Sequence, residues 1–260
     1  MKILVTAGHK KSRYSLAILS ELLNQNNISI ECVEVKTFSI KRFRRYLRQY
    51  KLETIIKKFM VHFSDNITNR LSNETLPIKE FLKNKNIRFT SIKSFCKNNN
   101  IKHYITDNLN SPKIINLLGK NEFDFVIYSG GGILRKKFID IAKLGVLNAH
   151  SGYLPNFRGM NAIEWSVLSD FTPHTTIHFI DAGIDTGCIL YTEPIPFSPD
   201  LYLYRGNAVV HNVNLLMKVL KNIDFYIQNK ITQNKLDGKQ YFVMHNELKK
   251  VVEKKLLEKD

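Results

Sequence analysis

The first 35 residues follow an order that few folds can accommodate. An apolar run from Lys2 to Ala7 ends at Gly8, apolar residues then recur at helical spacing over residues 16–23, and a second apolar run follows at residues 28–35. A buried strand, a helix and another buried strand in this order form a βαβ unit, in which the two strands are parallel. This opening predicts an α/β protein with a mostly parallel sheet flanked by helices.

The same alternation returns beyond residue 100. Apolar runs there predict further strands, and apolar residues at helical spacing between them predict helices. Ser198, Pro199 and Asp200 predict a helix start, because they supply a cap and a proline at the first helical position. The expected strands are residues 101–105, 123–128, 145–147, 175–180 and 188–192, and the expected helices are residues 112–118, 136–142 and 199–229.

Between these regions lies a strongly basic segment, residues 41–59. It holds eight lysines and arginines against one acid, and it places Phe43, Leu47 and Tyr50 on one helical face. Such a segment either binds phosphate, tRNA or a membrane surface, or forms a solvated face on an inserted helix, as a run of charges usually does. We expect a core at residues 1–195 with this helical insertion at about 40–85, and a C-terminal helical extension at residues 196–260.

Composition removes several classes of protein. Of the 260 residues, 43% are hydrophobic and 24% are charged, which excludes a disordered or fibrous chain. The three cysteines lie far apart without metal-ligand spacing, so we expect a reducing compartment and no metal. No apolar stretch approaches the ~20 residues of a membrane span, so we expect a cytoplasmic protein with no membrane partner. The net charge of +16 indicates an anionic partner or a diffuse excess of lysine.

Polar side chains stand directly at the end of one predicted strand. Asn148 and His150 are two residues apart, so both leave the strand on the same face. Ligands bind at the carboxyl ends of the strands in open parallel sheets. Asparagine can donate a hydrogen bond to a developing oxyanion, and histidine can hold or move a proton near neutral pH. A later loop adds Asp181 and Asp185, and either carboxylate could orient His150.

Other interpretations of these residues stay open. Ser151 could act as a nucleophile, but no G-x-S-x-G surrounds it. His150, His178 and an aspartate could hold a metal, although their spacing is not that of ligands on one helix face. His150 could also be a structural histidine that caps its loop. An Asn/His/Asp set without a nucleophile in an elbow motif favours group transfer without a covalent intermediate.

Around these residues the sequence resembles the folate-dependent formyltransferase family. Two motifs carry the resemblance, a loop after one strand and a block around the next, and they are strongest within residues 123–192. The matching positions are Asn148-x-His150 with Leu154-Pro155-x-x-Arg158-Gly159, and Thr176-x-His178 with Asp185-x-Gly187.

The resemblance implies a Rossmann-like formyltransferase core that uses N10-formyltetrahydrofolate as formyl donor. An acceptor amine would attack the formyl carbon, while Asn148 and protonated His150 hydrogen-bond the oxygen that gains negative charge. Asp185 would keep His150 charged, with Asp181 as the rival carboxylate or a turn residue. The implied positions are the catalytic Asn148, His150 and Asp185, the cofactor-binding Gly132, Ile133, Leu134, Ile180 and Asp181, and the substrate-binding Asn156 and Arg158, the last of which would face a phosphate of the acceptor or shape the loop.

The acceptor has to be judged from the rest of the chain, because several classes in the family share this centre. Methionyl-tRNA formyltransferases add a C-terminal domain, for which the 75 residues after Asp185 leave little room. Glycinamide ribonucleotide transformylases carry a Gly/Asn/Ser-rich phosphate loop, from which residues 9–12, His-Lys-Lys-Ser, depart. Formyltetrahydrofolate deformylases begin with a regulatory domain, whereas the predicted sheet here begins at Lys2.

The remaining class, the sugar-nucleotide N-formyltransferases, acts on amino sugars of bacterial surface polysaccharides. Those enzymes have short, variable C-terminal regions and inserted helices, and a nucleotide diphosphate gives the basic surface a partner. We therefore expect a small-molecule sugar nucleotide as substrate and no nucleic acid, and a homodimer is left open. The non-enzymatic alternative is a basic nucleic-acid-binding module, against which the intact Asn/His/Asp set argues.

Overall fold

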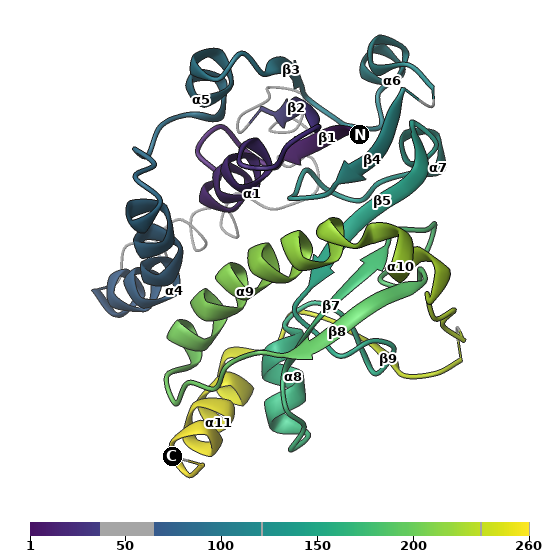
Figure 1. Ribbon diagram of the computed structural model, residues 1–260. Helices are drawn as coiled ribbons and strands as arrows, with labels where there is room; N and C mark the ends of the chain where they lie inside the picture. The colour runs from purple at the N-terminus through teal and green to yellow at the C-terminus, as the bar shows by residue number, and fades with distance from the viewer. Residues whose placement is uncertain (37–64, 121, 235, 260) are drawn as a thin grey trace, which may run out of the picture.

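The computed structural model describes residues 1–36, 65–120, 122–234 and 236–259 (Figure 1). The predicted basic segment at residues 41–59 lies outside these ranges, so its interpretation stays a prediction. Within the described ranges, no helix combines the length and the apolar character that crossing a bilayer requires.

The core of the molecule is a mixed sheet with the strand order β3-β2-β1-β4-β5-β7-β8. The strands from β3 to β5 are parallel, whereas β7 pairs antiparallel with β5, and β8 pairs antiparallel with β7. We call β3, β2, β1 and β4 the parallel half, and β5, β7 and β8 the antiparallel half. The strands are β1 Lys2–Ala7, β2 Ser29–Val35, β3 Lys102–Thr106, β4 Phe123–Ile127, β5 Ala142–His150, β7 His174–Phe179 and β8 Ile189–Pro194. The predicted α/β fold with a mostly parallel sheet is confirmed.

Helices cover both faces of this sheet. One apolar cluster joins the strands to α1, α4, α5 and α9, and a second joins the opposite face to α6 and α7. Figure 1 shows α9 running across the antiparallel half, with α1 over the strands beside it. The helices are α1 Arg13–Leu23, α4 Asp65–Asn84, α5 Ile92–Asn98, α6 Pro112–Leu118, α7 Lys136–Ile139 and α9 Leu201–Lys221.

The prediction of one helix over residues 199–229 is wrong in two respects. The helix begins at Leu201 and not at residue 199, because Asp200 is the cap and its side chain accepts a 2.7 Å hydrogen bond from the Leu203 N–H. It also ends at Lys221, where Asn222 leaves helical geometry with φ −129° and ψ 40°, and α10 Ile223–Gln228 follows.

The remaining elements form a small layer below the antiparallel half. A two-stranded parallel sheet joins β6 Phe157–Gly159 to β9 Lys239–Tyr241. Helices α8 Ala162–Leu168 and α11 Asn246–Leu257 bury a third apolar cluster with the start of α9. The described part of residues 196–260 thus contains one strand, β9, besides its helices, and β9 pairs with β6 in the segment that follows β5. The division of the chain at residue 195 stays a prediction.

Candidate active site

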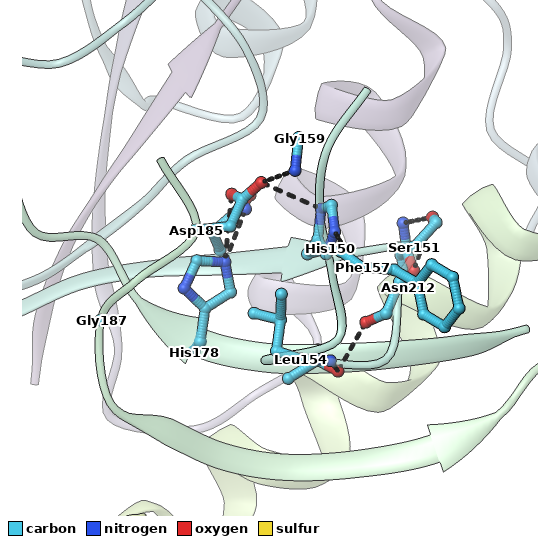
Figure 2. A network of polar contacts seen from close by, with 12 residues as sticks. His150, Ser151, Leu154, Phe157, Gly159, His178, Asp185, Gly187 and Asn212 are labelled. Carbon is cyan, nitrogen blue, oxygen red and sulfur yellow. Dashed lines mark hydrogen bonds and ion pairs between the residues drawn. The ribbon is translucent and has the colours of Figure 1, made fainter. Parts of the chain in front are cut away.

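The candidate site forms where β5 and β7 run antiparallel past each other. In their register, Asn148 lies opposite His178 and His150 lies opposite Thr176. Asp185 reaches both histidines from the loop after β7: its Oδ2 is 3.6 Å from Nδ1 of His150, and its Oδ1 is 3.7 Å from Nε2 of His178. Figure 2 shows this carboxylate facing both rings. The structure brings the residues predicted as catalytic together, and it adds a second histidine.

His178 fixes the orientation of the Asn148 amide. It is 1% exposed, and burial lowers its pKa to about 4, so the ring is neutral near pH 7. Its Nδ1 lies 2.8 Å from the carbonyl oxygen of Phe179, which can only accept, so Nδ1 carries the proton. Nε2 is then an acceptor, 3.0 Å from Nδ2 of Asn148. Asn148 donates one amide N–H to His178, and no described residue is found to accept from its second N–H.

In His150 the other ring nitrogen, Nε2, carries the proton. Its Nε2 lies 2.8 Å from the carbonyl oxygen of Phe157, so Nε2 donates and Nδ1 faces Asp185. A Cβ atom on Gly152 would come within 2.5 Å of Nε2, so only glycine lets the loop close over the ring. The resemblance led us to expect a donor from His150 toward the reacting oxygen. In this geometry Nε2 is engaged, and Nδ1 is the nitrogen that can accept a proton beside a carboxylate.

The loop that carries Asp185 is tightly folded. Asp185 itself has φ 53°, in the left-handed region that residues other than glycine seldom adopt. Its Oδ2 accepts a 2.8 Å hydrogen bond from the Gly159 N–H, and Gln233 donates to the carbonyl oxygens of Asp185 and Gly187. A Cβ atom on Gly187 would collide with the carbonyl oxygen of Phe179. Contacts from three segments therefore hold the Asp185 carboxylate against the histidines.

Asp181, the rival carboxylate, has another task in this loop. Its Oδ1 accepts hydrogen bonds from the Gly183 N–H at 3.0 Å and from the Thr186 hydroxyl at 2.6 Å. These bonds close the turn that leads to Asp185. The geometry favours the turn interpretation of Asp181.

The loop after His150 is tied to helix α9. Asn212 on α9 accepts a 2.7 Å hydrogen bond from the Thr175 hydroxyl and donates a 3.0 Å bond to Oγ of Ser151 (Figure 2). The hydroxyl of Thr176, the residue after Thr175, donates to the carbonyl oxygen of Gly152 at 2.7 Å. Ser151 is thus a bonded loop residue, and Asn212 holds the chain that follows His150.

A large cavity opens at the carboxyl ends of the parallel half. It measures about 1080 Å³ and lies against the predicted cofactor-binding residues Gly132 and Ile133. Ile133 is 73% exposed, whereas Leu134 is buried in the core beneath, with Ile180 packed against that core. The cations that line the cavity are Lys36, Lys113 and Arg135.

The two predicted substrate-binding residues lie elsewhere. Arg158 is buried, and its Nη2 donates to the carbonyl oxygens of Asn234, at 3.0 Å, and Asp237. Asn156 is exposed, and its carbonyl accepts from the Lys239 N–H at 3.2 Å. Neither residue lines the large cavity or a smaller one next to His150. Of the two roles that the sequence left open for Arg158, the geometry favours shaping the loop.

Two contributors to this site were missed from the sequence. His178 was noted only as part of a motif and as a conceivable metal ligand, and Asn212 was not noted. To place His178 opposite Asn148 requires both the direction and the register of residues 174–179 relative to β5, and the sequence carries a signal for neither. Among the described residues, no group of three or more His, Cys, Asp or Glu side chains is arranged to hold a metal ion.

The arrangement combines an amide donor, a proton acceptor and a half-buried carboxylate that lies 3.6 and 3.7 Å from the two histidines. It has no activated hydroxyl or thiol, since Ser151 bonds to Asn212 rather than to His150. Such a set can stabilise negative charge on a carbonyl oxygen and take a proton from an attacking amine. This is the chemistry of direct acyl or formyl transfer to nitrogen.

Comparison with known proteins gives the class. A family model described as formyl transferase matches residues 70–214, more than half of the chain. The chain therefore belongs to the formyl transferase family, as the motifs had indicated.

The matches fall into three groups: methionyl-tRNA formyltransferases, sugar N-formyltransferases and, among solved structures, phosphoribosylglycinamide formyltransferases. Methionyl-tRNA formyltransferase from Prochlorococcus marinus (strain MIT 9215) is 30% identical over 173 residues, 63% of this chain and 53% of the relative. The chain spans about half the length of the curated relatives it matches. Among solved structures, a sugar N-formyltransferase from Shewanella sp FDAARGOS_354 aligns with TM-score 0.55 and 12% identity, over 99% of this chain and 88% of that one. An N-formyltransferase from Helicobacter canadensis, in complex with folinic acid and dTDP-3-aminofucose, aligns with TM-score 0.55 and 16% identity, over 93% and 70%. At these identities the structures show a shared fold.

Proposed function

We propose that this protein transfers a formyl group from N10-formyltetrahydrofolate to the amine of a nucleotide-linked amino deoxysugar, as a step in making bacterial surface polysaccharide. The observation that carries the proposal is the cluster of Asn148, His150 and Asp185 at the carboxyl end of β5, in a chain of the formyl transferase family. The Helicobacter canadensis protein of similar fold binds a folate and a 3-amino sugar nucleotide, which supports both substrate classes.

The residues at the large cavity fit a folate. The cavity of about 1080 Å³ is of the size that holds a molecule built from a pterin, a benzoyl ring and a glutamate. A Cβ atom on Gly132 would meet nothing within 4 Å, so backbone there is open to a flat ring. Lys36, Lys113 and Arg135 would hold the glutamate carboxylates. When bound, the donor supplies a formyl group on nitrogen.

Four residues of the chain have separate roles in the proposed formyl transfer. The second amide N–H of Asn148 would donate to the formyl oxygen as that oxygen gains negative charge, because His178 already engages the first. Nδ1 of His150 would accept the proton that the attacking amine loses, since its Nε2–H stays hydrogen-bonded to the Phe157 carbonyl oxygen. The same proton would pass to the donor's nitrogen as the bond between that nitrogen and the formyl carbon breaks. Asp185 stabilises the charged imidazole that results. His178 acts through Asn148 and stays neutral.

A second acceptor class has its own support. The curated relatives include methionyl-tRNA formyltransferases at about 30% identity, higher than the identity to the sugar enzymes of similar fold. Initiator methionyl-tRNA is therefore the alternative acceptor, and the proposal must be tested against it directly.

The test is formyl transfer in vitro with N10-formyltetrahydrofolate. The acceptors are a panel of uridine- and thymidine-diphosphate 3-amino and 4-amino deoxyhexoses, charged methionyl-tRNA, and no acceptor. We expect a mass increase of one formyl group on at least one sugar nucleotide, lost in His150→Ala. Product on tRNA alone would move the protein to the translation class, and formate released without an acceptor would make it a deformylase.

A further inference from the structure

A second, smaller cavity adjoins His150. It measures about 240 Å³ and is lined by His150, Ser151, α8 and residues of α4 and α9. Its charged lining consists of two carboxylates and one guanidinium, from Glu74, Glu164 and Arg205. The large cavity, in contrast, is lined by three cations and one acid, Asp107.

The three charged side chains form one cluster, in which Arg205 pairs with both glutamates. Arg205 Nη1 donates to Oε1 of Glu164 at 2.7 Å, and its Nη2 and Nε lie 2.9 and 3.2 Å from Oε1 of Glu74. A Cβ atom on Gly206 would come within 2.6 Å of the Glu74 carbonyl oxygen, so glycine lets α4 approach α9 here. Asn161 donates to Oε1 of Glu164 at 2.6 Å. The cluster is therefore held from three helices and one loop.

Both carboxylates of the cluster line the cavity. Every hydrogen bond found between the described residues and these two carboxylates ends on Oε1, so Oε2 of each remains as an acceptor. The Glu164 side chain is only 2% exposed, and that of Glu74 is 27% exposed. Burial disfavours the charge on Arg205, but the two carboxylates outweigh burial and raise its pKa, so the guanidinium stays charged. The cluster carries a net charge of −1, beside the residue that receives the proton.

We propose that this cavity binds the amine-bearing ring of the acceptor, with Glu74 and Glu164 accepting hydrogen bonds from its hydroxyl and amine N–H groups. The inference rests on the proposed function and names the residues that select its substrate. At roughly 30 Å³ per water molecule, the cavity has the room of about eight waters, which suits one sugar ring and not a whole nucleotide. A ring bound here presents its amine to Nδ1 of His150.

The sign of the charge makes the cavity selective. Hydroxyl and amine groups can donate to a carboxylate, whereas a phosphate or a ring carboxylate cannot and is repelled. The acceptor is thus oriented with its ring at the carboxylates and its diphosphate outside this cavity. Amino sugars with a carboxylate on the ring are excluded as substrates.

The experiment measures the acceptor and the donor separately in Glu74→Gln. Glutamine keeps the size and one oxygen acceptor but removes the negative charge, so we expect the acceptor KM to rise about tenfold, with donor KM and kcat within twofold. Binding of the same nucleotide amino sugars is measured by calorimetry without donor, and Kd should rise in parallel. Glu193→Gln is the matched control, because Glu193 also pairs with an α9 cation, Lys218 at 2.6 Å, and does not line the cavity.

Selectivity provides a second variant and a second outcome. In Glu164→Gln combined with Glu74→Gln, binding of a nucleotide-linked amino sugar acid should improve relative to the wild type, which a merely structural role would not produce. Equal acceptor Kd in wild type and Glu74→Gln, with sugar formylation intact, would overturn this inference and leave the proposed function standing. If the wild type neither formylates nor binds any member of the panel, both fail. If it binds them without formylating them, the Kd values alone decide the inference.

Discussion

The two halves of the sheet present different surfaces at the carboxyl ends of their strands. In the parallel half, the mostly buried strands β1 and β4 lead into glycines, and exposed cations line the large cavity beside them. In the antiparallel half, Asn148 on β5 hydrogen-bonds His178 on β7, and Asp185 from the following loop lies 3.7 Å from His178. The parallel half offers room and charge, and the antiparallel half offers fixed geometry.

The direction of pairing explains the difference. Side chains directly opposite each other on antiparallel strands have Cβ atoms ~5 Å apart, so one strand can position a group on the next. Asn148 and His178 are such a pair. In the parallel half, the residues around the cavity come from separate loops and contribute mainly charge. We therefore expect substitutions in the antiparallel half to lower kcat, and substitutions in the parallel half to raise KM.

The largest effect is expected at the catalytic strand. His150→Ala or Asn148→Ala should lower kcat by ~100-fold or more, because the first removes a proton acceptor, which contributes ~10²–10⁴-fold, and the second removes a donor to a developing oxyanion, which contributes ~10²–10³-fold. Circular dichroism and thermal unfolding should show an intact fold, and the donor KM should change little. Near-normal kcat in both variants would remove the antiparallel half from the chemistry.

The two loop carboxylates should differ in the same assay. Asp185→Asn should lower kcat by ~100-fold, since the charged His150 loses its partner. Asp181→Asn should cost less than about tenfold, because the amide oxygen can still accept from Gly183 and Thr186. The reverse order would mean that Asp181 carries the chemistry.

The two halves of the sheet also differ in how much of each could be predicted from the sequence. The βαβ opening was predicted nearly to the residue, since buried strands, a spaced helix and a turn at Gly8 leave little choice. Asn148, His150 and Asp185 were found through two motifs, and the structure brings them together. The pairing of Asn148 with His178 could not be predicted, because a six-residue strand carries no signal for its direction. Likewise, the contact between Glu74 and Arg205 could not be predicted from the sequence, because the two residues are 131 positions apart.

The buried histidine gives the antiparallel half a signature in stability. Burial lowers the pKa of His178 from 6.5 to about 4, so the unfolded chain binds a proton more readily than the folded one between these values. The free energy of unfolding should therefore fall as pH falls from about 6.5 to about 4, by about 3 kcal/mol at most from this residue, and stay unaffected by it above pH 6.5. The measurement is urea unfolding of the wild type and His178→Gln across this range.

In His178→Gln that part of the pH dependence should vanish, while kcat falls because the Asn148 amide loses its fixed partner. His9→Gln is the control, since His9 is exposed in the loop after β1. An unchanged pH profile in His178→Gln would show that the ring titrates alike in the folded and unfolded chain.

The smallest effect is expected in the parallel half. Lys113→Glu combined with Arg135→Glu should raise the donor KM about 30-fold or more and leave kcat within twofold, because each lost attraction contributes about 1 kcal/mol at contact distance in water. The rise should shrink as salt is increased from 0.05 to about 0.5 M, since the Debye length falls well below 10 Å. Lys137→Glu on α7 is the control, as Lys137 is exposed but does not line the cavity. A loss of kcat at saturating donor would contradict the division between the two halves, because it would place transition-state contacts in the parallel half. A rise in the acceptor KM in place of the donor KM would assign the large cavity to the nucleotide.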